Sequence, residues 1–525
     1  MKKKVFGITL VSTVILGLLA ACGTSGGAKA EEKNDGSKDK AENITVWSHV
    51  SQPSQTVASW KESPFHTGLA EASGIDVNWE FPAEGTDSAQ AFNLLLSDTD
   101  LPEVMVYNLR NDAESYINDG IIQDLTKLLP EKAPNYWKFL QENPDLAKGV
   151  MTDSGKYYGF GIFRESDVQG SFYGPMLRKD WLEEQKLNVP TNADEWEHML
   201  QVFNDEYGAQ FSFVSNVLNF SGLSGAFGAH GTFGLAYYIE DKKVKATQEQ
   251  TEWRDYMAWL NNLYSQGLID PDVVTMDDES LKTKAANDKV GATFNLGSRV
   301  NVYTDQSKAN GKSAEWMHVP YPNQADGSPS ASFFTNRRTQ DPVWVVTTAA
   351  KDESLDTALA WLDFAYSEAG NDYWNFGVEG ETYTREGDRK FWTDKILENE
   401  LGVAEALLLH TGLSGTGLGV QRLDSTARTH ADIRETSPGF IWDNENKQAR
   451  EAVYPVGTTL TAEESKEAAS IQNTIDTYIS ENSMKFMTGE KSLDEYEDFV
   501  AELKNQGLDR LVEIKQAAYD RYLER

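Results

Sequence analysis

The chain has 525 residues, of which 40% are hydrophobic and 11% aromatic, and its formal net charge is −34 at pH 7. This apolar content is enough for two or three domains with cores of their own and excludes a largely disordered chain. The excess of 82 acidic over 48 basic residues disfavours a nucleic-acid or anionic-membrane partner, because both attract surfaces rich in Lys and Arg. Acidity alone does not identify a ligand, since most acidic side chains lie on the solvated surface.

The N-terminus has the pattern of an export signal. Three lysines precede an apolar run at 5–20 that is too short for a mature membrane span. The segment LAACG around Cys22 resembles the bacterial lipobox, which implies that residues 1–21 are a signal peptide and that Cys22 carries the lipid, including palmitate. Cys22 is the only cysteine in the chain, so it has no partner for a disulfide. The alternative interpretation is a free cysteine in a discarded leader.

After a polar segment at 22–42, which we predict to be a flexible tether, strand and helix patterns alternate. The predicted strands are rich in β-branched and aromatic residues or alternate between apolar and polar side chains, and they lie at 43–47, 75–81 and 101–107. Predicted helices lie at 88–97 and 116–129. Such alternation is typical of α/β layers, so we predict an α/β fold.

The same alternation continues through the rest of the chain. Further strands are predicted at 156–163, 290–296, 316–321 and 343–347, and further helices at 196–203, 252–266 and 354–367. Trp253, Met257, Leu260 and Tyr264 share one face of the helix at 252–266, which indicates core packing. A capping box at 492–495 begins a long amphipathic segment that ends at Arg525.

Four stretches of the chain resemble family 1 extracellular solute-binding proteins. LPEVMVYN at 101–108 is similar to an LPDII segment of that family. The other three look like its LplA/YtcQ-like oligosaccharide-binding branch, and they are KYYGF, NFGVEGETY and FMTGEKSLDEYEDFVAELKNQGLDRLVEIKQAAYDRY. Each motif alone is weak, but their order from the lipobox to the last helix makes the resemblance specific.

The resemblance implies a two-lobed, periplasmic-binding-protein-like (type II) α/β fold with an interlobe cleft and a hinge. We expect lobe 1 at 43–160 plus 321–375 and lobe 2 at 161–320 plus 376–525. Each lobe is discontinuous in sequence, because a chain that leaves one lobe and later returns to it builds each lobe from two separate segments.

The resemblance also implies a lipid-anchored receptor on the extracellular face of the cell membrane of a Gram-positive bacterium. Such a receptor captures an oligosaccharide and presents it to the permease subunits of an ABC transporter. We expect a monomer that touches the membrane through its lipid only and has no cofactor, no catalytic residue and no nucleic-acid partner.

Two other classes of protein stay open. A secreted glycoside-acting enzyme needs two carboxylates about 5 to 9.5 Å apart, and an acidic chain has many such pairs by chance. The sequence has no HExxH motif, and it has no GxSxG motif in the expected folded region at 43–525, which disfavours an enzyme. A peptide-binding or adhesive surface lipoprotein would instead expose a shallow aromatic patch.

A sugar site needs aromatic platforms and fixed polar groups, and open α/β sheets bind ligands beyond the carboxyl ends of their strands. Five candidate residues follow predicted strands in the N-terminal region. They are Trp47 and His49 after the first strand, and Tyr107, Asn108 and Arg110 after the third. Corresponding loops of related maltose-type binding proteins carry aromatic and polar contacts, while ordinary loop packing is the alternative.

Eight further candidates lie later in the chain, namely Tyr158, Arg164, Asn295, Arg299, Trp344, Phe376, Glu379 and Tyr383. Arg164 suits either a ligand group or a salt bridge between the lobes. For Trp344, core burial is the alternative. Glu379 is bracketed by Val378 and Gly380, so it suits either two sugar hydroxyls or a turn.

Two segments depart from the pattern of the resembled branch. Many of its members carry an EF-hand-like loop after the helix that here ends near Phe203, but 204–210 is too short and too poor in oxygen ligands for calcium. We therefore predict no structural metal. The apolar, glycine-rich stretch at 211–234 also departs from the pattern, and reshaping of the cleft on lobe 2 by this stretch would leave the ligand class open.

Overall fold

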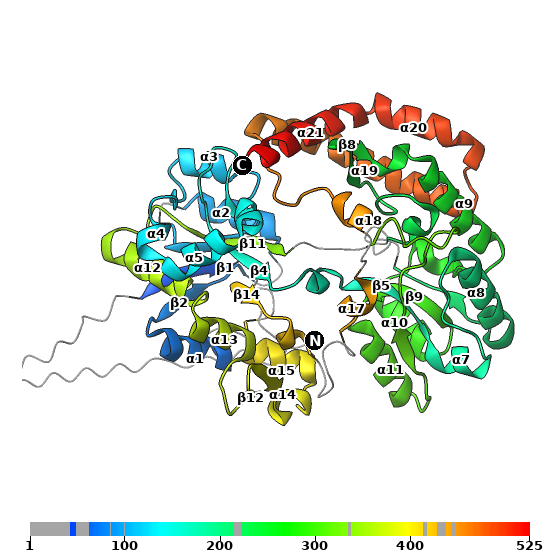
Figure 1. The fold of residues 1–525 in the computed structure, drawn as a ribbon, viewed down its shortest axis with the longest axis horizontal. Coiled ribbons are helices and arrows are strands. Elements are labelled where there is room, and N and C mark those ends of the chain that lie inside the picture. The colour runs from blue at the N-terminus through cyan, green and yellow to red at the C-terminus, as the bar shows by residue number, and fades with distance from the viewer. Residues whose placement is uncertain are drawn as a thin grey trace, which may run out of the picture. The chain divides into compact units, whose positions relative to one another are not determined.

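The structure is a computed structural model that describes residues 43–48, 62–83, 86–98, 100–214, 222–333, 338–412, 417–427, 437–443 and 447–525. The expected signal peptide, Cys22, the expected tether and His49 lie outside the described residues. The chain from residue 41 onwards contains two main sheets, each with its own helices (Figure 1).

The first sheet has six strands in the order β14-β4-β11-β3-β1-β2. Their bounds are Ile44–Ser48 (β1), Val77–Glu80 (β2), Val104–Tyr107 (β3), Phe160–Arg164 (β4), Thr339–Val346 (β11) and Gly419–Gln421 (β14). Strand β1 runs parallel to β2 and β3, while β11 runs antiparallel to β3 and β4. The predicted strands at 75–81 and 101–107 are thus confirmed, although they begin two and three residues later than predicted.

Alternate side chains of these strands belong to different cores, as the period of two in a strand requires. Val46 and Val104 pack in one core with Trp344, while Trp47 and Met105 pack in another. Both faces of the sheet are therefore covered. The helices of this part are Pro64–Ser73 (α1), Ser88–Leu96 (α2), Ala113–Asn118 (α3), Leu129–Lys132 (α4), Pro134–Glu142 (α5), Pro144–Ala147 (α6), Asp352–Phe364 (α12), Glu368–Phe376 (α13), Asp394–Leu397 (α14) and Val403–His410 (α15).

Four tryptophans stabilise the first core. The ring of Trp344 lies 5.6 to 6.2 Å from those of Trp79, Trp361 and Trp374, measured between centroids. The Nε1–H of Trp344 donates to the carbonyl oxygen of Gly417, 3.1 Å away. A buried ring whose indole N–H has a hydrogen-bond acceptor is the arrangement expected of a core tryptophan.

The second sheet has four strands in the order β10-β5-β9-β6. Their bounds are Tyr173–Arg178 (β5), Gln210–Phe211 (β6), Val290–Leu296 (β9) and Trp316–His318 (β10). Strand β9 has the predicted bounds, and all its residues except Leu296 are buried because β5 and β6 cover both its edges. A mostly apolar run, here with Thr293 and Asn295 as its polar members, is typical of such a central strand.

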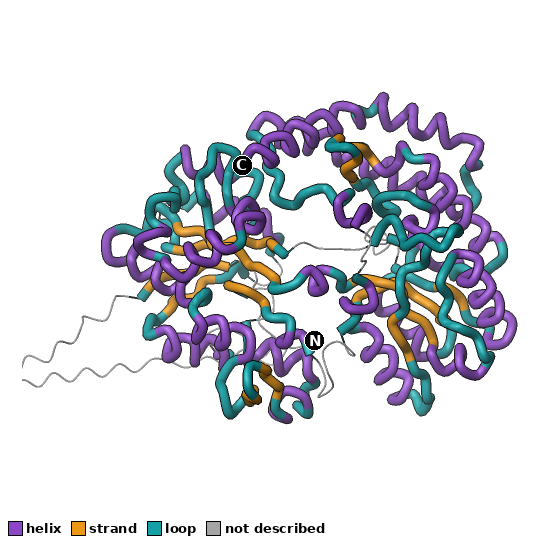
Figure 2. Tube along the Cα trace, viewed as in Figure 1, coloured by secondary structure: helices purple, strands orange, loops and turns teal. Residues whose placement is uncertain are grey.

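Long helices lie in the same part of the molecule as the second sheet (Figure 2). They and their shorter neighbours are Lys179–Glu184 (α7), Ala193–Tyr207 (α8), Thr251–Ser265 (α9), Asp278–Ala286 (α10), Arg299–Ala309 (α11), Gly439–Trp442 (α17), Lys447–Glu451 (α18), Ala462–Thr488 (α19), Tyr496–Asn505 (α20) and Leu508–Glu524 (α21). In α9, Trp253, Met257 and Leu260 are buried as predicted. A capping box between Thr461 and Glu464 begins α19. None of the described helices combines the length and apolarity that a membrane span needs.

Two hairpins and several single turns of 3-10 helix complete the described residues. The hairpins pair Tyr237–Glu240 (β7) with Lys243–Ala246 (β8), and Tyr383–Glu386 (β12) with Arg389–Trp392 (β13). In the first, Asp241 and Lys242 both have positive φ, as the two-residue turn of a hairpin requires. The 3-10 turns used below are Lys148–Val150 (η2), Asp167–Gly170 (η3) and Leu223–Phe227 (η5).

The chain passes from the first sheet to the second between β4 and β5, and returns between β10 and β11. This organisation is the two-lobed α/β type II fold. One expectation was wrong in detail. The segment at 376–525 was expected in lobe 2, but β14 pairs in parallel with β4 in the first sheet, because Gly419 to Gln421 hydrogen-bond alongside Ile162 to Arg164.

Candidate ligand-binding cavity

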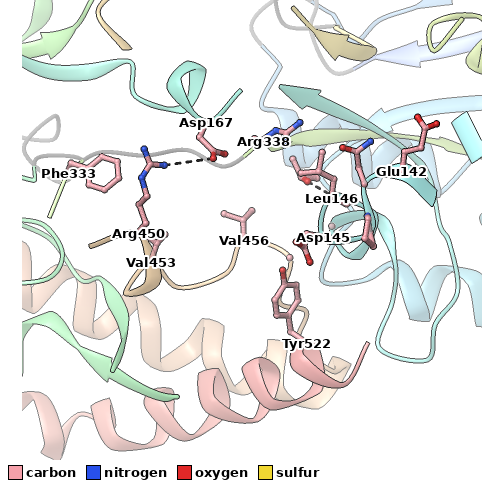
Figure 3. Close-up of a pocket in the computed structure, with 15 residues that line it drawn as sticks. Glu142, Asp145, Leu146, Asp167, Phe333, Arg338, Arg450, Val453, Val456 and Tyr522 are labelled. Atoms are coloured by element: carbon pink, nitrogen blue, oxygen red, sulfur yellow. Dashed lines mark hydrogen bonds and ion pairs between the residues drawn. The ribbon is translucent and has the colours of Figure 1, made fainter. Parts of the chain in front are cut away.

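A cavity of about 530 Å³, here called the main cavity, is lined by residues that pack with both cores (Figure 3). Its volume is in the range of small-molecule sites. The lining residues are Glu142, Asn143, Pro144, Asp145, Leu146, Gly149, Asp167, Phe333, Arg338, Thr339, Arg450, Val453, Val456, Gly457 and Tyr522.

Opposite walls of the main cavity belong to different lobes. Leu146 and Gly149 flank Ala147 and Val150, which are core residues of the first lobe. Tyr522 lies on α21, whose Leu511 and Ile514 belong to the core of the second lobe. A ligand in this cavity would therefore contact both lobes at once.

Two arginines in the main cavity are held in place by other groups of the protein. Arg450 pairs with Asp443, with 2.5 Å between Nη2 and Oδ1, and its Nη1 lies 3.8 Å from Oδ2 of Asp167. Arg338 donates from Nε to the backbone oxygen of Arg164 at 2.8 Å. Because these contacts orient both guanidinium groups, the lining is polar and preorganised.

Aromatic rings lie on two sides of the main cavity. Phe333 lies near Arg450, whose guanidinium carbon is 5.8 Å from the centre of the ring, and Tyr522 faces the cavity from α21 (Figure 3). Lys148 is 5.2 Å from the centre of the Tyr522 ring. Rings together with Asn143, Thr339 and carboxylates match the C–H faces and hydroxyl rim of a sugar.

The glycine-rich stretch of the second lobe packs against the backbone that carries Phe333. A Cβ on Gly222 would lie 2.4 Å from Cα of Phe333, and one on Gly225 would lie 2.3 Å from the backbone nitrogen of Ser332. Only glycine allows this approach. The described part of 211–234 therefore helps to position one wall of the main cavity.

The described N-terminal candidates, Trp47, Tyr107, Asn108 and Arg110, do not line the main cavity. Trp47 is 5% exposed and packs against Phe92, whose ring also stacks on Tyr107 at 4.0 Å. Arg110 comes closest, because its Nη1 donates to the carbonyl oxygen of the cavity-lining Val456 at 2.6 Å. Asn108 is exposed and is not among the lining residues.

Three candidates have no exposed surface, so they offer nothing to a ligand in this structure. Tyr158 donates its hydroxyl to the backbone oxygen of Gly149 at 3.1 Å. Trp344 is a member of the tryptophan cluster, and Phe376 packs in a small separate core with Tyr383. Tyr158 stands just before β4, Trp344 lies on β11 and Phe376 ends α13, and neighbouring parts of the fold cover all three side chains.

Arg164 lies beside the main cavity and is nearly buried. Its guanidinium carbon is 5.1 Å from the centre of the Phe172 ring, and burial lowers its pKa to about 10. Its backbone oxygen accepts the hydrogen bond from Arg338, so Arg164 supports a lining residue.

The candidates at the end of β9 have structural partners. Asn295 donates to the hydroxyl of Tyr303 at 3.0 Å and accepts from the backbone N–H of Leu296. Arg299 pairs with Asp278, with 2.7 Å between Nη2 and Oδ2. Neither residue lines the main cavity.

Glu379 and Tyr383 line a different hollow of about 780 Å³ beside α1 and α13, here called the α13 groove. It is larger than the main cavity, but its described lining comes only from 68–72 and 364–385, within one lobe. The hydroxyl of Tyr383 donates to Oε2 of Glu379 at 3.3 Å. We favour the main cavity because only that space joins the two lobes.

No described group of three or more His, Cys, Asp or Glu side chains is arranged to hold a metal ion. After α8, Gly208 adopts a φ of 62° and the chain enters β6 at Gln210. This direct connection leaves no long loop where the resembled branch often has a calcium site. The absence of a structural metal stays a prediction.

The fold and the shared cavity define a two-lobed ligand-capturing protein. Residues 52–372 match the family model described as bacterial extracellular solute-binding protein, and the chain belongs to this family. The resemblance drawn from the motifs is thus confirmed.

Relatives named for the saccharides they bind match at least 92% of the chain. A fructooligosaccharide ABC transporter substrate-binding protein, FusA of Streptococcus pneumoniae, is 23% identical over 99% of each chain. A polygalacturonan/rhamnogalacturonan-binding protein, YtcQ of Bacillus subtilis, is 23% identical over 96% of each chain. The solved structure of a human-milk-oligosaccharide (HMO)-binding protein from Bifidobacterium longum infantis has a TM-score of 0.73 and 19% identity, covering 92% of this chain and 99% of its own.

Sequence reasoning missed Phe333, Arg450 and Tyr522. Tyr522 lies within the C-terminal run that resembles the family, so that motif was the available signal. Phe333 and Arg450 stand in irregular or short segments without a recognisable pattern.

Proposed function

We propose that this protein captures an oligosaccharide outside the cell and presents it to the permease of an ABC transporter. The observation that carries the proposal is the main cavity, which combines aromatic rings, an amide and charged groups from both lobes. FusA and YtcQ, both oligo- or polysaccharide-binding by name, support this ligand class.

We propose capture without chemical conversion of the ligand. The described lining of the main cavity contains no Ser, Cys or His, which are the usual side chains of nucleophilic catalysis. Its acidic residues are Glu142, Asp145 and Asp167, and the last of these faces Arg450. Glycoside hydrolysis by a pair of these acids is the second function to be tested.

We further propose a monomer held on the surface of a Gram-positive cell by a lipid on Cys22, with 22–42 as its tether. The proposed lobes follow the sheets: 43–164 with 338–427 form lobe 1, and 165–333 with 437–525 form lobe 2. Ligand in the main cavity would stabilise one relative arrangement of the lobes, which is how a hinged receptor reports that it is loaded.

The test is isothermal titration calorimetry of the full chain in detergent against neutral and acidic oligosaccharides from plants and hosts. We expect saturable binding of at least one oligosaccharide, with the sugar recovered unchanged by chromatography. Recovery of shorter products would favour the glycoside-acting enzyme. Absence of binding to every saccharide, combined with binding of peptides, would favour the peptide-binding lipoprotein.

A further inference from the structure

A second hollow of about 230 Å³, here called the side pocket, adjoins the main cavity. Phe333 and Val453 line both spaces, so the two are neighbours across these side chains. The other lining residues are His230, Gly231, Thr232, Ala236, Tyr237, Tyr238, Ala331, Ser332, Ala449, Ala452 and Tyr454. The side pocket has less than half the volume of the main cavity, which suits one sugar ring rather than two.

The two spaces differ in charge. The described lining of the main cavity includes three acidic residues and two arginines, whereas no Asp, Glu, Lys or Arg is among the described residues that line the side pocket. Methyl groups of Ala331, Ala449 and Ala452 supply an apolar wall. Thr232 and Ser332 add two hydroxyl side chains to the lining.

A flat aromatic pair forms part of the side pocket. The rings of His230 and Tyr238 stack with 5.1 Å between centroids and an angle of 24° between planes. Nδ1 of His230 lies 3.0 Å from the carbonyl oxygen of Ala331, so a neutral ring donates there and keeps Nε2 as an acceptor. Burial lowers the pKa of His230, which favours this neutral form at pH 7.

We propose that the side pocket is a subsite for one uncharged sugar unit of an oligosaccharide that continues from the main cavity past Phe333 and Val453. This inference rests on the proposed function and narrows its ligand class. A neutral sugar can place a C–H face on the apolar wall and its hydroxyls on neutral donors and acceptors. A uronate unit would bury its carboxylate without a Lys or Arg among the described residues that line the pocket, which is unfavourable.

The first test fills the side pocket. Ala236→Trp should weaken binding of long neutral gluco-, galacto- or fructo-oligosaccharides by about tenfold or more, while binding of the shortest ones that bind is unchanged. Ala369→Trp is the matched control, because Ala369 is an exposed alanine in the remote α13 groove. Thermal unfolding of both variants verifies that they fold. Unchanged affinity of Ala236→Trp for every length would overturn the subsite.

The second test adds a cation to the side pocket and measures a gain in affinity, which a misfolded variant cannot produce. Ala236→Lys should bind oligogalacturonides about tenfold more tightly than the unchanged protein does, and neutral oligosaccharides less tightly. If the unchanged protein already binds oligogalacturonides as well as neutral oligosaccharides of equal length, the preference for an uncharged unit is wrong. If it binds no saccharide at all, the proposed function itself fails.

Discussion

Nε of Arg521 lies 2.6 Å from Oδ2 of Asp153, and this ion pair joins segments that pack on different cores. Asp153 follows Val150 of the first core, whereas Arg521 lies on α21, which packs on the second. Arg521 also pairs with Glu464, with 2.5 Å between Nη2 and Oε2. Arg525 pairs with Asp153 as well, and donates to the backbone oxygens of Met151 and Gly457. These contacts hold the end of α21 that carries Tyr522.

Replacing Arg521 should destabilise the protein. Arg521→Met leaves Glu464 without the arginine and removes one of the two cations beside Asp153, so we expect the free energy of unfolding to fall by about 1.5–3 kcal/mol. The measurement is urea unfolding followed by tryptophan fluorescence.

Arg510→Met is the matched control for that prediction. Arg510 is on the same helix and pairs with Glu467, but both side chains are more than 40% exposed. Such surface pairs contribute about 0–1 kcal/mol, so the control should be nearly neutral. Equal losses in the two variants would show that the cluster around Asp153 has no special role.

The same cluster predicts how stability depends on pH. Burial alone would raise the pKa of Asp153, but hydrogen bonds from Thr459, Arg525 and Arg521 outweigh it and lower the pKa below 3.8. Burial would also raise the pKa of Glu464, but hydrogen bonds from Arg521 and Thr461 outweigh this effect and lower the pKa below 4.5. As pH falls, these two carboxylates therefore bind protons in the unfolded chain before they do so in the folded protein. The stabilisation is present above about pH 4.5 and is lost as pH falls through the lowered pKa values.

Thermal unfolding between neutral pH and pH 3 measures this effect. We expect the melting temperature to fall as the pH is lowered. The fall should be less steep in Arg521→Met, because the arginine that lowers both pKa values is absent. A variant with the same acid dependence as the unchanged protein would refute the assignment to this cluster.

Tyr522 should contribute to saccharide binding through its ring. Tyr522→Leu keeps a partly apolar side chain on α21 but removes the flat face, so we expect binding to weaken by about 0.5–1.5 kcal/mol without loss of secondary structure. Calorimetry measures the affinity and circular dichroism the fold. Unchanged affinity in a folded variant would remove Tyr522 from the site.

Trp344 should act on stability rather than on binding. It has no exposed surface and packs against three other tryptophans, so Trp344→Ala should lower the free energy of unfolding by about 3–5 kcal/mol. Chemical denaturation gives the loss. If the variant were as stable as the unchanged protein but failed to bind saccharide, Trp344 would be a ligand residue after all.

Sequence patterns identified many elements because their signals are local. The run at 290–296 is mostly apolar and became the buried β9, and the spacing of Trp253, Met257 and Leu260 places them on one buried face of α9. The end of β3 at Tyr107 was also predicted, and the end of β1 at Ser48 was predicted to within one residue.

The sequence alone therefore determined the α/β alternation, the amphipathic faces and, through ordered motifs, the family. It did not determine which strand ends face the ligand. Trp47 and Tyr107 stand where strands end, but Phe92 of α2 packs against both rings. Only the tertiary structure brought Leu146, Phe333, Arg450 and Tyr522 around one cavity, because residues so far apart in the chain become neighbours only when the lobes fold and the chain crosses between them.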